Sequence, residues 1–384
     1  MASNRLQQLH DAGVSIWLDF IERTILHNGD LDRRVRDDAL TGMTSNPTIF
    51  EKALAEGTAY DAQIREAAGD LSAMELFELV ATTDVRDACD RFRGVYDKTK
   101  GDDGYVSIEV SPAAANDVKA TIDEARRLWK TVDRPNVFVK VPGTVDGAES
   151  VRQLIAAGIN VNITLLFALE AHDRVIAAYM SGLEERVKRG QPVDRIASVA
   201  SFFVSRVDSE VDKRLEALGS GKGEAGSASR LPPPASLKGK AAIANAKLAY
   251  QLFLERFSSP RWKALEAKGA RVQKPLWAST STKNPAYRDV MYVEHLVGPR
   301  CINTLPPQTI EAFRDHGEVR RTVDKDVDEA KRELEQLEQL GISMKDVTAK
   351  LLVDGIASFQ KSFDAVIAGL ERKSKALGRE LAAR

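Results

Sequence analysis

The sequence predicts an α/β protein built as a closed (β/α)8 TIM-type barrel, with extra helices after the second strand and at the carboxyl end. Eight short apolar runs are separated by amphipathic segments along most of the 384 residues. Alternation of strands and helices on this scale gives parallel strands joined by right-handed crossovers. An open, doubly wound sheet fits the same alternation, but no GxGxxG follows the first run, which weakens a dinucleotide-binding version of it.

The predicted strands follow one another along the chain with room for a helix between most of them. Amphipathic stretches such as AAANDVKATIDEARRLWKTV fill these gaps and have the periodicity of helices. A barrel of this kind typically needs roughly 250 residues, so the chain carries additional segments. The predicted strands are residues 13–20, 39–46, 105–110, 136–141, 159–167, 195–203, 271–280 and 299–305.

Three segments exceed what the barrel itself requires. Residues 47–104 are predicted to form a long helical excursion between the second and third strands. Residues 218–240 contain GSGKGEAGSAS and LPPPAS, which bury too little apolar surface to become ordered, and we predict a flexible surface loop there. Residues 321–384 are predicted to form two helices that pack on the barrel. Since strand-like runs continue beyond residue 240, we predict a single domain over residues 1–384.

Composition and charge exclude several classes of function. The formal net charge of −1 argues against a general binder of nucleic acids or acidic membranes. The chain shows no signal peptide and no run of 18 apolar residues, so we expect no membrane span. Its two cysteines, Cys89 and Cys301, form no CxxC motif, which favours a reducing, cytoplasmic location. The five histidines lack metal-ligand spacing, and no metal site is predicted.

Lys140 lies within the apolar run NVFVKV, where an ammonium group is unexpected. Side chains alternate across a strand, so the three valines of this run share one face and Lys140 lies on the other. Three further strands follow the same rule and place Asp19, Glu109 and Thr164 opposite their aliphatic residues. In a barrel the aliphatic face packs on helices, and the polar face then points into the carboxyl mouth, where such barrels carry chemistry.

This arrangement favours a lysine-dependent reaction of a carbonyl compound. A lysine that loses hydration more readily presents a neutral amine, which attacks carbonyl groups. Asp19 and Glu109 are then candidates for the proton transfers that imine formation and carbon–carbon cleavage require. Taken singly, each residue also has a structural interpretation, as a solvated strand-end lysine, a turn aspartate or a rim glutamate. The coincidence of polar groups at the same kind of position on four strands favours a catalytic site over these structural interpretations.

Four motifs, in this order, resemble the transaldolase family: GMTSNPTIF (42–50), NVFVKVPGT (136–144), GINVNITLLF (158–167) and SFFVSRVD (201–208). The resemblance runs from about residue 10 to about residue 370, and the chain is similar to the longer bacterial form. It implies transfer of a dihydroxyacetone unit from sedoheptulose 7-phosphate to glyceraldehyde 3-phosphate, in the non-oxidative pentose phosphate pathway. The products would be erythrose 4-phosphate and fructose 6-phosphate.

The resemblance also implies roles for individual residues. The Schiff-base lysine falls on Lys140, the general acid/base on Asp19, the strand-three glutamate on Glu109 and the water-orienting threonine on Thr164. Where the family often has a second phosphate-binding arginine, this chain has Lys283, which supplies a point charge in place of a bidentate fork. The implied substrate-binding residues are Asn46, Ser107 and Asn162 for sugar hydroxyls, Ser201, Arg206 and Lys283 for phosphate, and Phe203.

Sugar phosphates are therefore the expected partners, with no metal or organic cofactor, no nucleic acid and no membrane; homodimer formation stays open. A fructose-6-phosphate aldolase is the nearest alternative, although those relatives are much shorter and have Gln and Tyr in place of Glu109 and Phe203. Another lysine-dependent aldolase on the same barrel is a further alternative. A catalytically inactive barrel that serves as a binding scaffold is the alternative from a different class; it would use the 218–240 loop and the carboxyl-terminal helices.

Overall fold

The computed structural model describes residues 4–55, 57–67, 70–220 and 232–382. Eight strands form one closed barrel in chain order, and each strand is parallel to both of its neighbours. Each predicted run corresponds to one strand, with β4 extending one residue beyond its run, which confirms the predicted (β/α)8 fold. The strands are β1 Val14–Asp19, β2 Leu40–Thr44, β3 Val106–Glu109, β4 Val137–Pro142, β5 Val161–Leu166, β6 Ser198–Phe203, β7 Lys274–Ala278 and β8 Cys301–Leu305.

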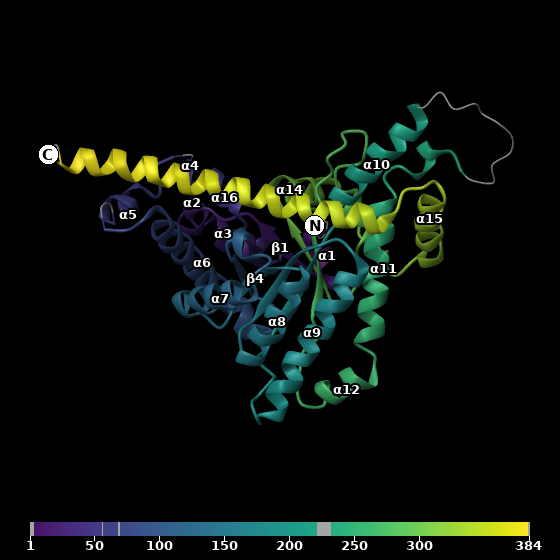
Figure 1. The fold of residues 1–384 in the computed structure, drawn as a ribbon, viewed down its shortest axis with the longest axis horizontal. Coiled ribbons are helices and arrows are strands. Elements are labelled where there is room, and N and C mark those ends of the chain that lie inside the picture. Colours follow the sequence, from purple (N-terminus) through teal and green to yellow (C-terminus); the bar gives the residue numbers. More distant parts are fainter. Residues whose placement is uncertain (1–3, 56, 68–69, 221–231, 383–384) are drawn as a thin grey trace.

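Helices connect consecutive strands and pack around the barrel (Figure 1). The segment between β2 and β3 is helical, as predicted, and contains three helices, of which the last, α6, is the crossover helix that packs on both strands. The helices before and between the strands are α1 Arg5–Asp11, α2 Arg23–His27, α3 Asp30–Asp37, α4 Pro47–Ala55, α5 Asp61–Glu66, α6 Ala73–Lys98, α7 Val118–Val132, α8 Val145–Ala157, α9 Leu169–Lys188, α10 Ser205–Ser220, α11 Ala241–Arg256, α12 Pro260–Glu266 and α13 Met291–His295.

The connection from β4 to α8 shows how the sequence VPGT ends one strand and begins the next helix. A Cβ added at Gly143 would lie 2.4 Å from Leu166 Cδ2 and 3.2 Å from the carbonyl oxygen of Thr164, so a side chain there would force its neighbours to shift. Thr144 then caps α8, since its side chain accepts a hydrogen bond from the amide of Gly147. At the other end Gly158 adopts φ +91°, the left-handed conformation that commonly ends helices. These signals fix the spacing between Lys140 on β4 and Thr164 on β5.

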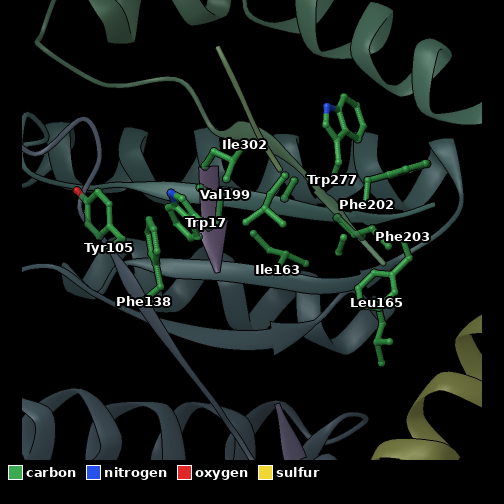
Figure 2. Close-up of a cluster of buried hydrophobic side chains, with 14 of the residues drawn as sticks. Trp17, Tyr105, Phe138, Ile163, Leu165, Val199, Phe202, Phe203, Trp277 and Ile302 are labelled. Carbon is green, nitrogen blue, oxygen red and sulfur yellow. The ribbon is translucent and has the colours of Figure 1, made fainter. Parts of the chain in front are cut away.

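Aromatic side chains fill the amino-terminal half of the barrel interior. The rings of Tyr105 and Phe138 stack with centroids 4.3 Å apart, and the Trp17 ring lies 6.1 Å from Phe138. Figure 2 shows these three side chains gathered beside one another, with Val199 and Ile302 close by. The indole of Trp17 also lies against Gly42, where a Cβ would come within 2.5 Å of it. This apolar layer closes one end of the barrel.

The carboxyl-terminal part follows α14 Pro307–His316 and forms two helices, α15 Val327–Gln339 and α16 Met344–Ala382, as predicted. Figure 1 shows α16 as a long yellow helix that crosses one side of the barrel and carries the carboxyl terminus away from it. It packs mainly on α4, α6 and α10 and also contacts β5. No helix within the described ranges is both long enough and apolar enough to cross a membrane.

The segment predicted as a flexible loop, residues 218–240, is described only at its two ends. Residues 218–220 belong to α10, and a short 3-10 helix, η2 Pro234–Leu237, follows further on. Residues 221–231, with most of the GSGKGEAGSAS sequence, lie outside the described residues.

Candidate active site

A cavity of about 430 Å³ opens at the carboxyl ends of the strands. Its volume falls in the range typical of sites for small molecules. Of the residues that the sequence singles out, Asp19, Asn46, Lys140, Thr164, Ser201, Phe203, Arg206 and Lys283 line this cavity. The structure therefore brings together residues from six strands or the segments that directly follow them, as the alternation of side chains predicts.

Lys140 lies at the floor of the cavity and is almost fully buried, with 5% of its surface exposed. Its Nζ atom lies 3.0 Å from Oε2 of Glu109 on the neighbouring strand and donates a hydrogen bond of 2.9 Å to the carbonyl oxygen of Ser45. Burial raises the pKa of Glu109, and the charge of Lys140 opposes this shift. Because burial favours the protonated form of this carboxyl group, Glu109 is placed to exchange a proton with a compound bound at the Lys140 amine.

Glu109 does not itself line the cavity that holds Asp19. It borders a second, smaller and mostly apolar space, which Asn46, Phe50 and Phe77 also line. Lys140 lines the larger cavity, so the ion pair of Lys140 and Glu109 connects the walls of the two spaces. The two acidic groups that flank Lys140 thus have separate surroundings.

Asp19 is the second carboxyl group of the site. Its Oδ1 atom accepts a hydrogen bond of 2.7 Å from the hydroxyl of Thr44, and that hydroxyl lies 2.6 Å from the hydroxyl of Thr304. Burial raises the pKa of Asp19, whereas the charge of Lys140 and the hydrogen bond from Thr44 lower it. A carboxyl group balanced in this way is suited to both accept and return a proton.

Ser107, Asn162 and Ser201 form a buried row of hydrogen bonds across three strands. The amide of Asn162 donates to Ser107 Oγ at 3.0 Å, and Ser201 Oγ donates to Asn162 Oδ1 at 2.6 Å. Of these three, Ser201 lines the cavity, and Ser107 and Asn162 lie behind its wall. In this arrangement Ser107 and Asn162 hydrogen-bond to each other, and their direct contact with a sugar hydroxyl stays a prediction.

Thr164 lines the cavity, and its hydroxyl is buried without a hydrogen-bond partner among the described residues. A buried hydroxyl without a partner costs free energy unless a ligand or water satisfies it. The next residue, Leu165, has φ +57°, where the register between β5 and β6 shifts. This bulge at the end of β5 sets the direction in which Thr164 points.

The outer part of the cavity is cationic. Arg206, Lys283 and Lys52 line it, and Lys283 donates a hydrogen bond of 2.9 Å to Ser281 Oγ. Burial lowers the pKa values of Lys283 and Arg206, and in Lys283 the charge of Arg206 lowers it further. Residues from the first turns of α4, α10 and α14 also line the cavity, and helix amino termini favour anions. The arrangement suits a phosphate group.

The sequence interpretation missed several residues of the site. Thr44 follows from the alternation of β2, because it lies two residues beyond Gly42 on the inward face. Ser281 lies two residues before Lys283, so the sequence around Lys283 could have indicated it. Two other cavity residues, Lys52 on α4 and Phe359 on α16, come from helices, so no strand pattern signals them.

No group of three or more His, Cys, Asp or Glu side chains within the described ranges is placed to hold a metal ion. The site holds a buried lysine and two carboxyl groups at the carboxyl end of a (β/α)8 barrel, together with a cationic rim. This combination defines a class of proteins that bind a phosphorylated carbonyl compound and react with it through a lysine amine.

Comparisons with known proteins narrow this class. The family model described as transaldolase/fructose-6-phosphate aldolase matches residues 16–370, and the chain belongs to this family. A transaldolase of Trichodesmium erythraeum is 45% identical over 380 residues, which cover 98% of this chain and 99% of that protein. A transaldolase of Acidothermus cellulolyticus is 46% identical over 377 residues, with 98% of each chain covered. A protein named transaldolase 2 of Nostoc sp. is 45% identical over 381 residues, covering 98% of this chain and 99% of that protein.

Proposed function

We propose that this protein is an enzyme, a transaldolase of the non-oxidative pentose phosphate pathway. It transfers a dihydroxyacetone unit from sedoheptulose 7-phosphate to glyceraldehyde 3-phosphate and gives erythrose 4-phosphate and fructose 6-phosphate. The observation that carries the proposal is the buried pair of Lys140 Nζ and Glu109 Oε2, 3.0 Å apart, at the floor of a cavity with a cationic rim. Full-length similarity to transaldolases supports it.

The reaction begins when the neutral amine of Lys140 attacks the C2 carbonyl of the ketose. The carbinolamine loses water to form an imine, and this step needs a proton donor at the departing hydroxyl. Glu109, whose pKa burial raises, supplies this proton through a water that Thr164 orients. The unpartnered hydroxyl of Thr164 at the cavity wall supports this role.

Asp19 then acts on the sugar. Its carboxylate removes the proton of the C4 hydroxyl, the C3–C4 bond breaks, and the electron pair moves onto the cationic imine to give an enamine on Lys140. The aldehyde product leaves. A new aldehyde enters, the enamine carbon attacks its carbonyl, and Asp19 returns the proton to the oxygen that becomes the new C4 hydroxyl. Hydrolysis of the imine then frees Lys140.

The rim of the cavity binds the phosphate end of each substrate. Arg206 and Lys283 carry positive charges into the cavity, and Ser201 adds a hydroxyl beside them. Asn46 lines the cavity near Lys140, which supports contact with a sugar hydroxyl. Sugar phosphates are the substrates that this combination of charges and hydroxyls recognises.

A fructose-6-phosphate aldolase is the alternative within the same family. Such an enzyme would cleave fructose 6-phosphate without an acceptor, whereas a transaldolase keeps the three-carbon unit as an enamine until an aldehyde arrives. Glu109, Phe203 and the length of the chain support the transferase. Coverage of 98% of this chain by relatives named transaldolase supports it as well.

A coupled assay separates the two activities. The protein is incubated with fructose 6-phosphate, with or without erythrose 4-phosphate, and the release of glyceraldehyde 3-phosphate is followed. We expect release that depends on erythrose 4-phosphate and equals the sedoheptulose 7-phosphate formed. Equal release without the acceptor, with free dihydroxyacetone, would identify an aldolase. No release in either mixture from a folded sample would favour the binding scaffold.

We also propose a cytoplasmic location, which the two free, buried cysteines Cys89 and Cys301 support, because such thiols are typical of reducing compartments. The homodimer that the sequence leaves open stays a prediction. Sedimentation equilibrium at micromolar protein concentration distinguishes one chain of 42.2 kDa from two.

A further inference from the structure

Two aromatic rings hold the guanidinium group of Arg206 at the rim of the cavity. Its Cζ atom lies 5.1 Å from the ring centroid of Phe203 and 5.8 Å from that of Phe359. Phe203 ends strand β6, whereas Phe359 comes from the middle of α16, more than 150 residues further along the chain. Both distances lie within the range in which a cation is attracted to the face of an aromatic ring.

Among the described residues, the guanidinium group of Arg206 has no hydrogen bond or ion pair with another part of the protein. The carboxyl groups of Asp19 and Glu109 affect the pKa of Arg206 through their charges, without a hydrogen bond to it. Arginine presents five N–H donors in a rigid fork that matches phosphate oxygens. The aromatic rings therefore hold the group without occupying these donors, which stay available to a ligand in the cavity.

Phe359 is fixed in place by the close approach of α16 to the barrel. It is 4% exposed and lines the cavity. One turn earlier, a Cβ added at Gly355 would lie 3.0 Å from Leu165 Cδ2 and 3.6 Å from Arg206 Nη1. The absence of a side chain at Gly355 thus lets α16 lie against both residues, and Phe359 reaches the guanidinium group as a result.

We propose that Phe359 is a positioning residue that holds Arg206 with its donors toward the phosphate of the substrate, so that α16 sets the affinity for phosphorylated sugars. The identity of the anion as a sugar phosphate rests on the proposed function. The geometry itself requires only an anion with the chemistry of phosphate. Loss of one partly buried cation–π contact predicts a weakening of phosphate binding by about three- to thirtyfold.

The test compares Phe359→Leu with Phe363→Leu on the same helix. Phe363 is 7% exposed and packs on Phe77, with ring centroids 5.2 Å apart, so its replacement disturbs α16 without removing a ring from Arg206. Phe359→Met is a second variant that keeps most of the volume without an aromatic face, and Phe359→Tyr keeps the face. Thermal unfolding checks that each variant is folded.

Binding of inorganic phosphate, measured by calorimetry, is the first readout because it needs no catalytic activity. We expect Phe359→Leu and Phe359→Met to weaken it about three- to thirtyfold, and Phe359→Tyr and Phe363→Leu to leave it within about twofold of the parent protein. In an active enzyme the KM for fructose 6-phosphate rises by the same factor, with little change in kcat. The KM for unphosphorylated glyceraldehyde as the acceptor stays unchanged.

Equal phosphate binding by the parent protein and both ring-free variants would overturn the inference. So would an equal loss in Phe363→Leu, because the effect would then come from the packing of α16. Phosphate binding that depends on Phe359 in a protein without transfer activity would contradict the proposed function and leave the inference standing. The two failures are therefore distinguishable.

Discussion

The two halves of the barrel interior are built from the same strands and differ in how they are filled. Near the amino ends, the rings of Trp17, Tyr105 and Phe138 border a gap of only about 20 Å³. At the carboxyl ends the cavity that Lys140 lines measures about 430 Å³. Trp17 lies two residues before Asp19, and Phe138 lies two residues before Lys140, so a shift of roughly 7 Å along each strand separates packing from chemistry.

This comparison teaches that one alternation serves two purposes. Every second residue of a strand points inward, and the choice of an aromatic or a polar side chain at that position decides whether the layer stabilises the barrel or reacts. Substitutions that remove activity should therefore fall in the carboxyl-terminal layer, and substitutions that remove stability in the amino-terminal layer.

Replacement of the reactive amine is expected to have the largest effect. Lys140→Met should lower kcat by a factor on the order of 10⁴ or more, since loss of a covalent nucleophile removes the entire reaction path. The fold should persist because Glu109 can take up a proton instead of remaining an unpaired buried charge. Steady-state kinetics and far-ultraviolet circular dichroism measure the two properties. Retained turnover in the folded variant would end the Schiff-base mechanism.

The opposite result is expected at the amino end of the barrel. Trp17→Ala should lower the free energy of unfolding by about 3–5 kcal/mol, the usual cost of removing a large buried aromatic side chain. It also removes the indole that donates a hydrogen bond of 2.9 Å to Asp103. Denaturant unfolding gives this value directly. If the loss stayed below about 1 kcal/mol while kcat collapsed, the division between the two layers would be wrong.

A buried carboxyl group outside the cavity should control how stability depends on pH. Asp208 on α10 accepts hydrogen bonds from the Tyr292 hydroxyl and the Ala242 amide, and burial raises its pKa to about 7. The folded state keeps this proton as pH rises from about 4 to 7, whereas the unfolded chain has lost it, so stability falls across that window and then levels off.

Asp208→Asn removes this titration. Relative to the parent protein, the variant should gain stability as pH rises from 4 to 8, by an amount on the order of 4 kcal/mol. Unfolding in urea at several pH values measures the difference. Parallel stability curves for the two proteins would show that Asp208 has an ordinary pKa, and that the pH dependence arises elsewhere, including the carboxyl groups of the cavity.

The smallest effect concerns the acid limb of the pH–rate profile. Thr44→Val removes the hydrogen bond that lowers the pKa of Asp19, so this pKa should rise further. Because Asp19 must be ionised to accept the C4 hydroxyl proton, the acid limb of kcat/KM should move to higher pH. Activity below the midpoint should fall by about two- to tenfold, as expected for one hydrogen bond. An acid limb that stays in place would show that Asp19 is not the group that titrates.

Much of this organisation could be predicted from the sequence because it depends on local rules. The alternation of side chains placed Asp19, Lys140 and Thr164 on the inner face, where the structure has them. Whether an inward-facing residue lines the cavity or lies behind its wall was harder to predict. Ser107 and Asn162 also point inward, but only the closed barrel shows that they bond to each other behind the cavity wall.

The remaining features depend on contacts between distant parts of the chain. Phe359 reaches Arg206 only because α16 crosses the barrel and approaches it at Gly355, and a helical periodicity does not say what a helix packs against. The left-handed conformation of Leu165 is likewise invisible in the sequence, because leucine has no preference for it. Phosphate recognition was therefore predicted through Arg206 and Lys283 without the aromatic ring from α16.

Trapping with borohydride tests the central claim most directly, namely that Lys140 carries the three-carbon unit between donor and acceptor. The protein is incubated with fructose 6-phosphate, reduced, digested and mapped by mass spectrometry. The account predicts a reduced three-carbon adduct on Lys140 that disappears when erythrose 4-phosphate is added before reduction. A folded protein with no adduct, or with an adduct on another lysine, would contradict it.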